Sequence, residues 1–158
     1  MCMKRVIGGV VLSIVLFCVP FGTSAKDRPI KSCVIELNID EAQELMQIAF
    51  AEGGNQGEDG QWLIMSVILN RVNSPDFPDS VHDVIYEPGQ FYTKGMKAAT
   101  PTADTHLALA RIECGEVAPQ IIAFESEKCD VLEKYFSYAF TFRDHKFLSR
   151  KEDAVCSR

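Results

Sequence analysis

The stretch IDEAQELMQIAFAEGGNQGEDGQWLIMSVILNRV, residues 39–72, carries two helical patterns separated by glycines. Asn38, followed three residues later by Glu41, resembles a capping box and predicts that the first helix begins here. Apolar residues then recur at the spacing of one helical face, namely Ile39, Ala42, Leu45, Met46, Ala49 and Phe50. Gly53 and Gly54 are expected to end this helix, which places Glu52 at its last position.

A second helix is predicted over residues 61–72, after a polar, glycine-rich loop at 55–60 in which Asp59 is the expected cap. It is apolar nearly all round, and its thin polar edge consists of Ser66, Asn70 and Arg71. A helix with this pattern belongs in the middle of a domain. Pro75 stops it, because proline disfavours helical geometry in the residue before it.

The remaining chain predicts shorter elements. We expect a helix over 81–86 capped by Asp79 or Ser80, an irregular segment over 93–101, and a helix from Thr102 or Asp104 to Cys114. Residues 120–124 are a strand candidate, 130–139 a short helix, and 140–142 an extended piece. The expected class is therefore mainly α, an α+β fold with a minor β element.

The first 25 residues have the pattern of a signal peptide. Lys4 and Arg5 precede an apolar run at 6–20, and small residues at 23–25 offer a cleavage site. The run is shorter than the roughly 20 apolar residues of a spanning helix, although an uncleaved anchor is the alternative. We therefore expect a secreted, extracytoplasmic protein with a leader at 26–37, one catalytic domain at 38–158 and no stable membrane span after cleavage.

Charge and cysteine content restrict the partners. Cleavage would remove two of the 16 basic and none of the 22 acidic side chains, so the formal charge of −6 would become −8. Nucleic acid is an unfavourable partner for such a domain, since its binding depends on Lys and Arg neutralising phosphates. Four cysteines would remain, Cys33, Cys114, Cys129 and Cys156. We expect disulfides with all three pairings open, because no C-x-x-C spacing supports the alternative of a metal site.

Glu52 is the candidate acid. The negative end of a helix macrodipole, apolar neighbours and the two glycines that follow would raise its proton affinity and admit a substrate. A carboxylic acid that stays protonated near neutral pH can donate a proton to a glycosidic oxygen. The alternative is an ordinary solvated surface glutamate. No H-E-x-x-H or G-x-S-x-G motif is present, which disfavours metalloprotease and serine hydrolase chemistry.

Several motifs occur together and in order: Ala51-Glu52, Gly60-Gln61, the Leu-Asn-Arg-Val of 69–72, Phe77-Pro78, and the Ile-Tyr-Glu-Pro-Gly-Gln-Phe of 85–91. Over residues 40–92 the chain resembles cell wall hydrolases of the SleB/CwlJ type, the spore cortex-lytic enzyme family. Downstream, residues 121–124 look like the family's apolar strand and 145–147 like its closing His-x-Phe. The chain departs from the family at Gly53 and Gly54, where members usually carry Ala-Arg.

The resemblance implies a lysozyme-like fold and cleavage of peptidoglycan glycan strands between N-acetylmuramic acid and N-acetylglucosamine, with Glu52 as the single catalytic glutamate. A lytic transglycosylase needs no second carboxylate, because the 6-hydroxyl of the muramic acid attacks the anomeric carbon. A muramidase would use a second acid, and Glu58, Asp59 and Glu87 are available for that role. The sequence does not place these acids relative to Glu52, and the resemblance favours the transglycosylase reaction.

Supporting roles follow from the turn at Pro88-Gly89. Tyr86, Gln90, Phe91 and Tyr92 are candidates to line a sugar groove, with burial of Tyr86 and Phe91 in the core as the alternative. Asn70 would bind substrate or else satisfy neighbouring loops. We expect no metal, no cofactor and a monomer. The rival function is a non-catalytic, disulfide-tied carbohydrate-binding domain on the same scaffold.

Overall fold

The computed structural model describes residues 35–151. The signal at 1–25, most of the leader, Cys33 and Cys156 lie outside the described residues, and their assignments stay predictions. Helix α1 (Ile39–Gly53) begins as expected, because the Asn38 side chain accepts from the Glu41 amide and Glu41 bonds back to the Asn38 amide. The residues before it, 35–38, form no helix or strand.

The expected polar loop at 55–60 is wrong. A short 3-10 helix, η1 (Gly54–Gln56), leads directly into α2 (Gly57–Val72), which therefore begins four residues before the predicted start. Gly57 enters the helix with φ 69°, a value that glycine adopts without strain. The central position of α2 is confirmed, since it packs against α1, α3, α5 and strand β1.

Three shorter helices complete the helical part. Helix α3 (Val81–Tyr86) has the expected bounds and is capped by the Ser80 hydroxyl, which accepts from the Asp83 amide. Helix α5 (Ala103–Glu113) also follows the prediction. The segment at 93–101 is not wholly irregular, because α4 (Thr93–Met96) forms one turn and buries Met96 against the core.

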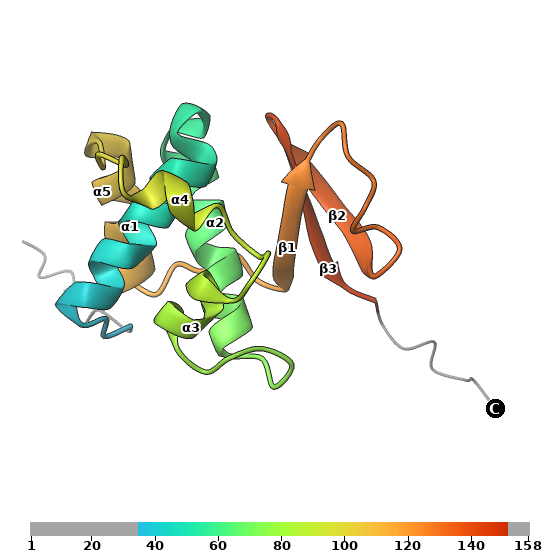
Figure 1. The fold of residues 1–158 in the computed structure, drawn as a ribbon, viewed down its shortest axis with the longest axis horizontal. Coiled ribbons are helices and arrows are strands. Elements are labelled where there is room, and N and C mark those ends of the chain that lie inside the picture. Colours follow the sequence, from blue (N-terminus) through green and yellow to red (C-terminus); the bar gives the residue numbers. More distant parts are fainter. Residues whose placement is uncertain (1–34, 152–158) are drawn as a thin grey trace, which may run out of the picture. The chain divides into compact units, whose positions relative to one another are not determined.

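The sheet holds three antiparallel strands in the order β1-β3-β2: β1 (Ile121–Ser126), β2 (Phe136–Phe142) and β3 (His145–Arg150). The strand predicted at 120–124 is confirmed, but the helix predicted at 130–139 is wrong. Pairing with β3 decides this segment, since Tyr138 faces Leu148 and Phe140 faces Phe147. Figure 1 shows the helices on one side of the described chain and the sheet on the other.

Two groups of buried side chains hold these parts together. The first lies among α1, α2, α3 and α5 and includes Leu45, Ile64 and Ile112, all fully buried. The second joins Leu63 and Val67 of α2 to Ile121 and Phe147 of the sheet. Helix α2 contributes to both groups, which explains why it is apolar nearly all round.

The described residues bear only in part on membrane spanning and on disulfide bonds. None of the helices in the described part combines the length and apolar character needed to cross a bilayer. Within residues 35–151 no disulfide joins Cys114 to Cys129, and Cys129 is exposed. The disulfide assignment therefore stays a prediction.

Candidate active site

Glu52 lies in the last turn of α1, immediately before the η1 turn, and is half-buried. Its Oε1 accepts a hydrogen bond of 2.5 Å from the backbone amide of Tyr92. Oε2 has no hydrogen-bond partner within residues 35–151. One oxygen of the carboxyl group is thus oriented by the protein, while the other is available to a substrate.

The pKa of Glu52 is raised above its usual value of 4.5. Desolvation by burial is the dominant cause, and the hydrogen bond from the Tyr92 amide partly opposes it, because that bond stabilises the charged form. The direction agrees with the expectation from sequence. An acid with this shift keeps its proton at a higher pH than a solvated glutamate does.

The loop that carries Tyr92 is held in place by Arg71. This guanidinium donates from Nη1 to Gln90 Oε1 (3.1 Å) and from Nε to the Ile122 carbonyl (2.7 Å). It also lies over the rings of Phe77 and Phe91, at 4.9 and 5.1 Å from their centroids. Arg71 therefore joins α2, the loop and β1.

Burial also perturbs Arg71 itself. Only 5% of the residue is exposed, and desolvation lowers its pKa to about 10, with the nearby Glu87 opposing the shift. Glu87 in turn has a buried oxygen, Oε2, without a hydrogen-bond partner among the described residues. The Glu87 carboxylate compensates the charge of the buried Arg71. Glu87 therefore helps Arg71 to hold the loop that carries Tyr92.

The η1 turn after Glu52 is attached to the hairpin of β2 and β3. Asp144, in the two-residue hairpin turn, accepts from Gln56 Nε2 (3.0 Å) and Asn55 Nδ2 (3.3 Å). Next to it His145 meets Phe124 edge to face at 5.3 Å, and Phe124 lies 6.1 Å from Phe91. These contacts link side chains from the Tyr92 loop through the sheet to the η1 turn. We call the linked residues the site ring, which consists of Asn55, Gln56, Phe91, Phe124, Asp144 and His145.

Sequence reasoning missed Gln56 and Asp144, which close the site ring. Gln56 is only 2% exposed, although its surrounding residues are polar and predicted a solvated loop. Burial lowers the pKa of His145, while the neighbouring Asp144 opposes that shift. Signals for these roles are absent from the sequence, because Gln56 and Asp144 are 88 residues apart.

The predicted substrate residues do not all lie together. Tyr92 is exposed, and its ring lies against Gly95, where an added Cβ would come within 2.7 Å of it. Tyr86 instead lies against His82, with the ring centroids 4.5 Å apart and the planes tilted by 36°, and lines a hollow beside the first half of α1. Asn70 donates to the carbonyls of Ala118 (2.7 Å) and Ile121 (2.8 Å), so its amide nitrogen supports a loop.

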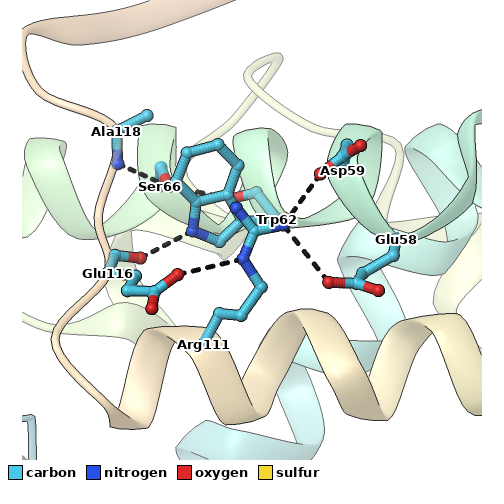
Figure 2. A network of polar contacts seen from close by, with 7 residues as sticks. All are labelled: Glu58, Asp59, Trp62, Ser66, Arg111, Glu116 and Ala118. Atoms are coloured by element: carbon cyan, nitrogen blue, oxygen red, sulfur yellow. Dashed lines mark hydrogen bonds and ion pairs between the residues drawn. The ribbon is translucent and has the colours of Figure 1, made fainter.

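Two candidate second acids are bound to a cation. Figure 2 shows Arg111 of α5 between Glu58 and Asp59 on one side and Glu116 on the other. The Arg111 guanidinium lies 4.0 Å above the Trp62 ring, whose Nε1 donates to the Glu116 carbonyl. Glu58 and Asp59 therefore serve to anchor α2 to α5. Across the described residues no group of three or more His, Cys, Asp or Glu has the arrangement of a metal site.

Comparisons with known proteins extend these observations. A family model described as Cell Wall Hydrolase matches residues 55–155, a span that begins three residues after Glu52. Spore cortex-lytic enzymes of Bacillus subtilis and Halalkalibacterium halodurans are 49% and 45% identical to the chain over 47 and 49 residues. Those matches cover 30% and 31% of this chain, but only 15% of the length of either relative.

Two solved structures resemble the fold. The catalytic domain of a germination-specific lytic transglycosylase, SleB, from Bacillus anthracis has a TM-score of 0.62 at 22% identity. The catalytic domain of the Bacillus cereus SleB protein has a TM-score of 0.60 at 23% identity. The matches cover 72% and 75% of this chain and 97% of each solved chain. The expected lysozyme-like α+β fold is thereby confirmed.

Proposed function

The chain belongs to the Cell Wall Hydrolase family, of the SleB type predicted from its motifs, and from this premise we propose that it cleaves peptidoglycan glycan strands between N-acetylmuramic acid and N-acetylglucosamine. The observation that carries the proposal is the state of Glu52. This carboxyl group is half-buried, has a raised pKa and leaves Oε2 open to a ligand. Such a group suits general acid catalysis at a glycosidic oxygen.

In the proposed reaction Glu52 acts first as acid and then as base. It donates its proton to the glycosidic oxygen as the bond to the anomeric carbon breaks. The 6-hydroxyl oxygen of the muramic acid then bonds to that carbon, and its proton passes to the Glu52 carboxylate. The products are a free hydroxyl on one strand end and a 1,6-anhydro sugar on the other, and Glu52 is again protonated.

The transglycosylase outcome is favoured over hydrolysis by the position of the other acids. A hydrolytic pair needs a second carboxylate facing the same bond. Glu58 and Asp59 are bound to Arg111, and Glu87 compensates the buried Arg71. Exposed Tyr92, beside Glu52, is the aromatic best placed to pack on a sugar face, with Gln90 and Phe91 shaping the loop behind it.

The family match and the half-buried Glu52, with its raised pKa and open Oε2, also favour catalysis over a carbohydrate-binding role. Export to the cell wall is part of the proposal, because the substrate lies outside the cytoplasm. The chain spans 15% of the curated relatives that it matches. What those whole proteins do is therefore no guide to a role in germination for this chain.

Digestion of purified peptidoglycan followed by mass analysis of the muropeptides tests this function. Wild-type protein is expected to release anhydro-muramic ends, and Glu52→Gln to reduce the rate at least about 100-fold, since the amide cannot donate or accept the proton. Release of reducing ends in place of anhydro ends would show that the protein is a muramidase and not a transglycosylase. Full activity of Glu52→Gln would refute the catalytic role of Glu52, and tight binding to sacculi by wild type without lysis would indicate a binding domain.

A further inference from the structure

A polar groove lies between the C-terminal end of α2 and one end of the sheet, on residues that the proposed chemistry does not use. Its volume is about 780 Å³, and Glu52 is not among its lining residues. The lining side chains are three amides (Asn70, Asn73, Gln120), three hydroxyls (Ser74, Ser137, Ser149), Arg150, Pro75 and Ile122. A groove of this size can hold a sugar-sized ligand.

The sheet connects this groove to the catalytic end. Ser149 of β3 pairs with Ile121 and Ser137 at the groove end of the three strands. His145 of β3 pairs with Ser126 and Phe142 at the opposite end, beside the site ring. Ser149 lies four residue steps along the extended strand from His145, which is roughly 13 Å. A polymer that follows β3 from the site ring can therefore reach the groove.

Gln120 occupies a backbone conformation that is costly for its residue type. Its φ is 66°, in the left-handed region that side chains other than Gly, Asn and Asp rarely adopt. The loop is held there by α2, because Asn70 binds the Ala118 and Ile121 carbonyls and Ser66 Oγ accepts from the Ala118 amide. Such strain persists where the surroundings enforce it and clusters at ligand sites. The side chain at 120 is thus exposed into the groove at a cost that glycine would avoid.

The charge of the groove selects the chemistry of the ligand. Arg150 is paired with Asp76 and also contacts the Ser74 hydroxyl, so its charge is already compensated. The Gln120 amide and the Ser137 hydroxyl have no hydrogen-bond partner in the part of the chain that the structure describes. Unused amide and hydroxyl groups without net charge match the acetamido and hydroxyl groups of a neutral sugar. A charged peptide would have to compete with the pair of Arg150 and Asp76.

We infer that this groove binds an N-acetylated sugar of the glycan strand remote from the cleaved bond, and that Gln120 supplies a hydrogen bond to it. The inference rests on the proposed function for the identity of the strand. The groove acts in binding. Loss of its contacts therefore lowers the affinity for long strands and leaves the chemical step at Glu52 unchanged.

The test uses the full chain and two substrates, glycan strands freed of their stem peptides and strands that keep them. Gln120→Gly removes the side chain and suits a φ of 66°, so we expect unchanged or higher thermal stability. KM for long strands should rise about fivefold, the effect of one lost hydrogen bond, with kcat unchanged. Gln120→Asn, which keeps an amide and tolerates this φ, should restore part of the affinity. Gln43→Ala, an exposed amide in the separate hollow beside α1, is the matched control.

The outcomes separate the two proposals. Wild-type protein that fails to cleave any peptidoglycan overturns the proposed function. Wild-type cleavage with the same KM in Gln120→Gly overturns the groove assignment alone. A KM difference seen only with peptide-bearing strands also overturns it, since the groove would then recognise the stem peptide.

Discussion

At the scale of single residues, the surroundings of each carboxylate decide its chemistry. Glu52 keeps one oxygen without a protein partner and has a raised pKa, because burial outweighs the hydrogen bond from the Tyr92 amide. Glu58 is bound to Arg111. Both are glutamates near a helix end, yet only the first is poised to hold and release a proton.

The raised pKa of Glu52 has a consequence for stability. The folded protein retains this proton at pH values where the unfolded chain, with a pKa near 4.5, has released it. Folding therefore becomes less favourable as the pH rises through this window, and the penalty is complete above the folded pKa. Glu52→Gln should raise the melting temperature at pH 7 by a few degrees.

The measurement is thermal unfolding of wild type and Glu52→Gln across pH. The difference should shrink towards pH 4, where both states of the wild type carry the proton. Glu44→Gln is a control, because Glu44 lies in the first half of α1, away from Glu52, where it contacts His82 of α3. A stabilisation of Glu52→Gln that does not vary with pH would contradict a raised pKa.

At the scale of elements, the hairpin of β2 and β3 completes the site by bringing Asp144 to the η1 turn. The loop that leads into it, residues 127–135, is fastened by Lys146. Its ammonium group binds Asp130 (2.5 Å) and Glu133 (2.8 Å) and lies 3.7 Å from Glu125. The hydrogen bonds to Asp130 and Glu133 raise the pKa of Lys146, so the group stays charged throughout the physiological range.

Lys146→Met should loosen this loop. Glu125 would lose its counter-charge, and its Oε2 holds the amides of Val131 and Leu132. We expect a melting temperature lowered by several degrees and faster hydrogen exchange at those two amides. Lys134→Met is the matched control, since the exposed Lys134 ammonium has the Tyr135 ring as its only recorded contact in residues 35–151, and Lys151 bonds to the Lys134 backbone carbonyl, which the variant keeps. Equal exchange in the two variants would show that Lys146 does not fasten the loop.

At the scale of the whole molecule, net charge shapes the encounter with the substrate. The chain has a formal charge of −6, and peptidoglycan in a cell wall is often accompanied by anionic polymers. Long-range attraction cannot then drive binding to the proposed substrate, so we expect affinity to come from contacts in the site ring and the proposed groove. This separates the chain from cationic wall enzymes, whose binding weakens with salt.

Binding of Glu52→Gln to whole sacculi should therefore not weaken between about 0.01 and 0.15 M salt, and should strengthen if repulsion is significant. Pull-down of the protein with sacculi at each ionic strength provides the measurement. A marked loss of binding with added salt would show that a local basic surface dominates over net charge. Repeating the series on sacculi stripped of anionic polymers isolates the contribution of repulsion.

Much of the fold followed from local patterns. The caps at Asn38 and Ser80 and the apolar spacing of α1, α2 and α5 fix helices through contacts within a few residues. The predictions that were wrong concern segments whose contact partners are distant in the sequence. Residues 136–142 form a strand because β3 pairs with them, and 57–60 are helical because Gln56 and Gly60 are buried beside the hairpin.

The sequence by itself determined the helical scaffold, the family and the choice of Glu52 as candidate acid, because these depend on short spacings and ordered motifs. Only the tertiary structure decided which residues surround that acid. It brought Tyr92, Asp144 and Arg71 into the support of the site, assigned Glu58 and Asp59 to Arg111, and separated Tyr86 from it. The physical reason is that burial and ion pairing act between side chains far apart in the chain, which local periodicity does not encode.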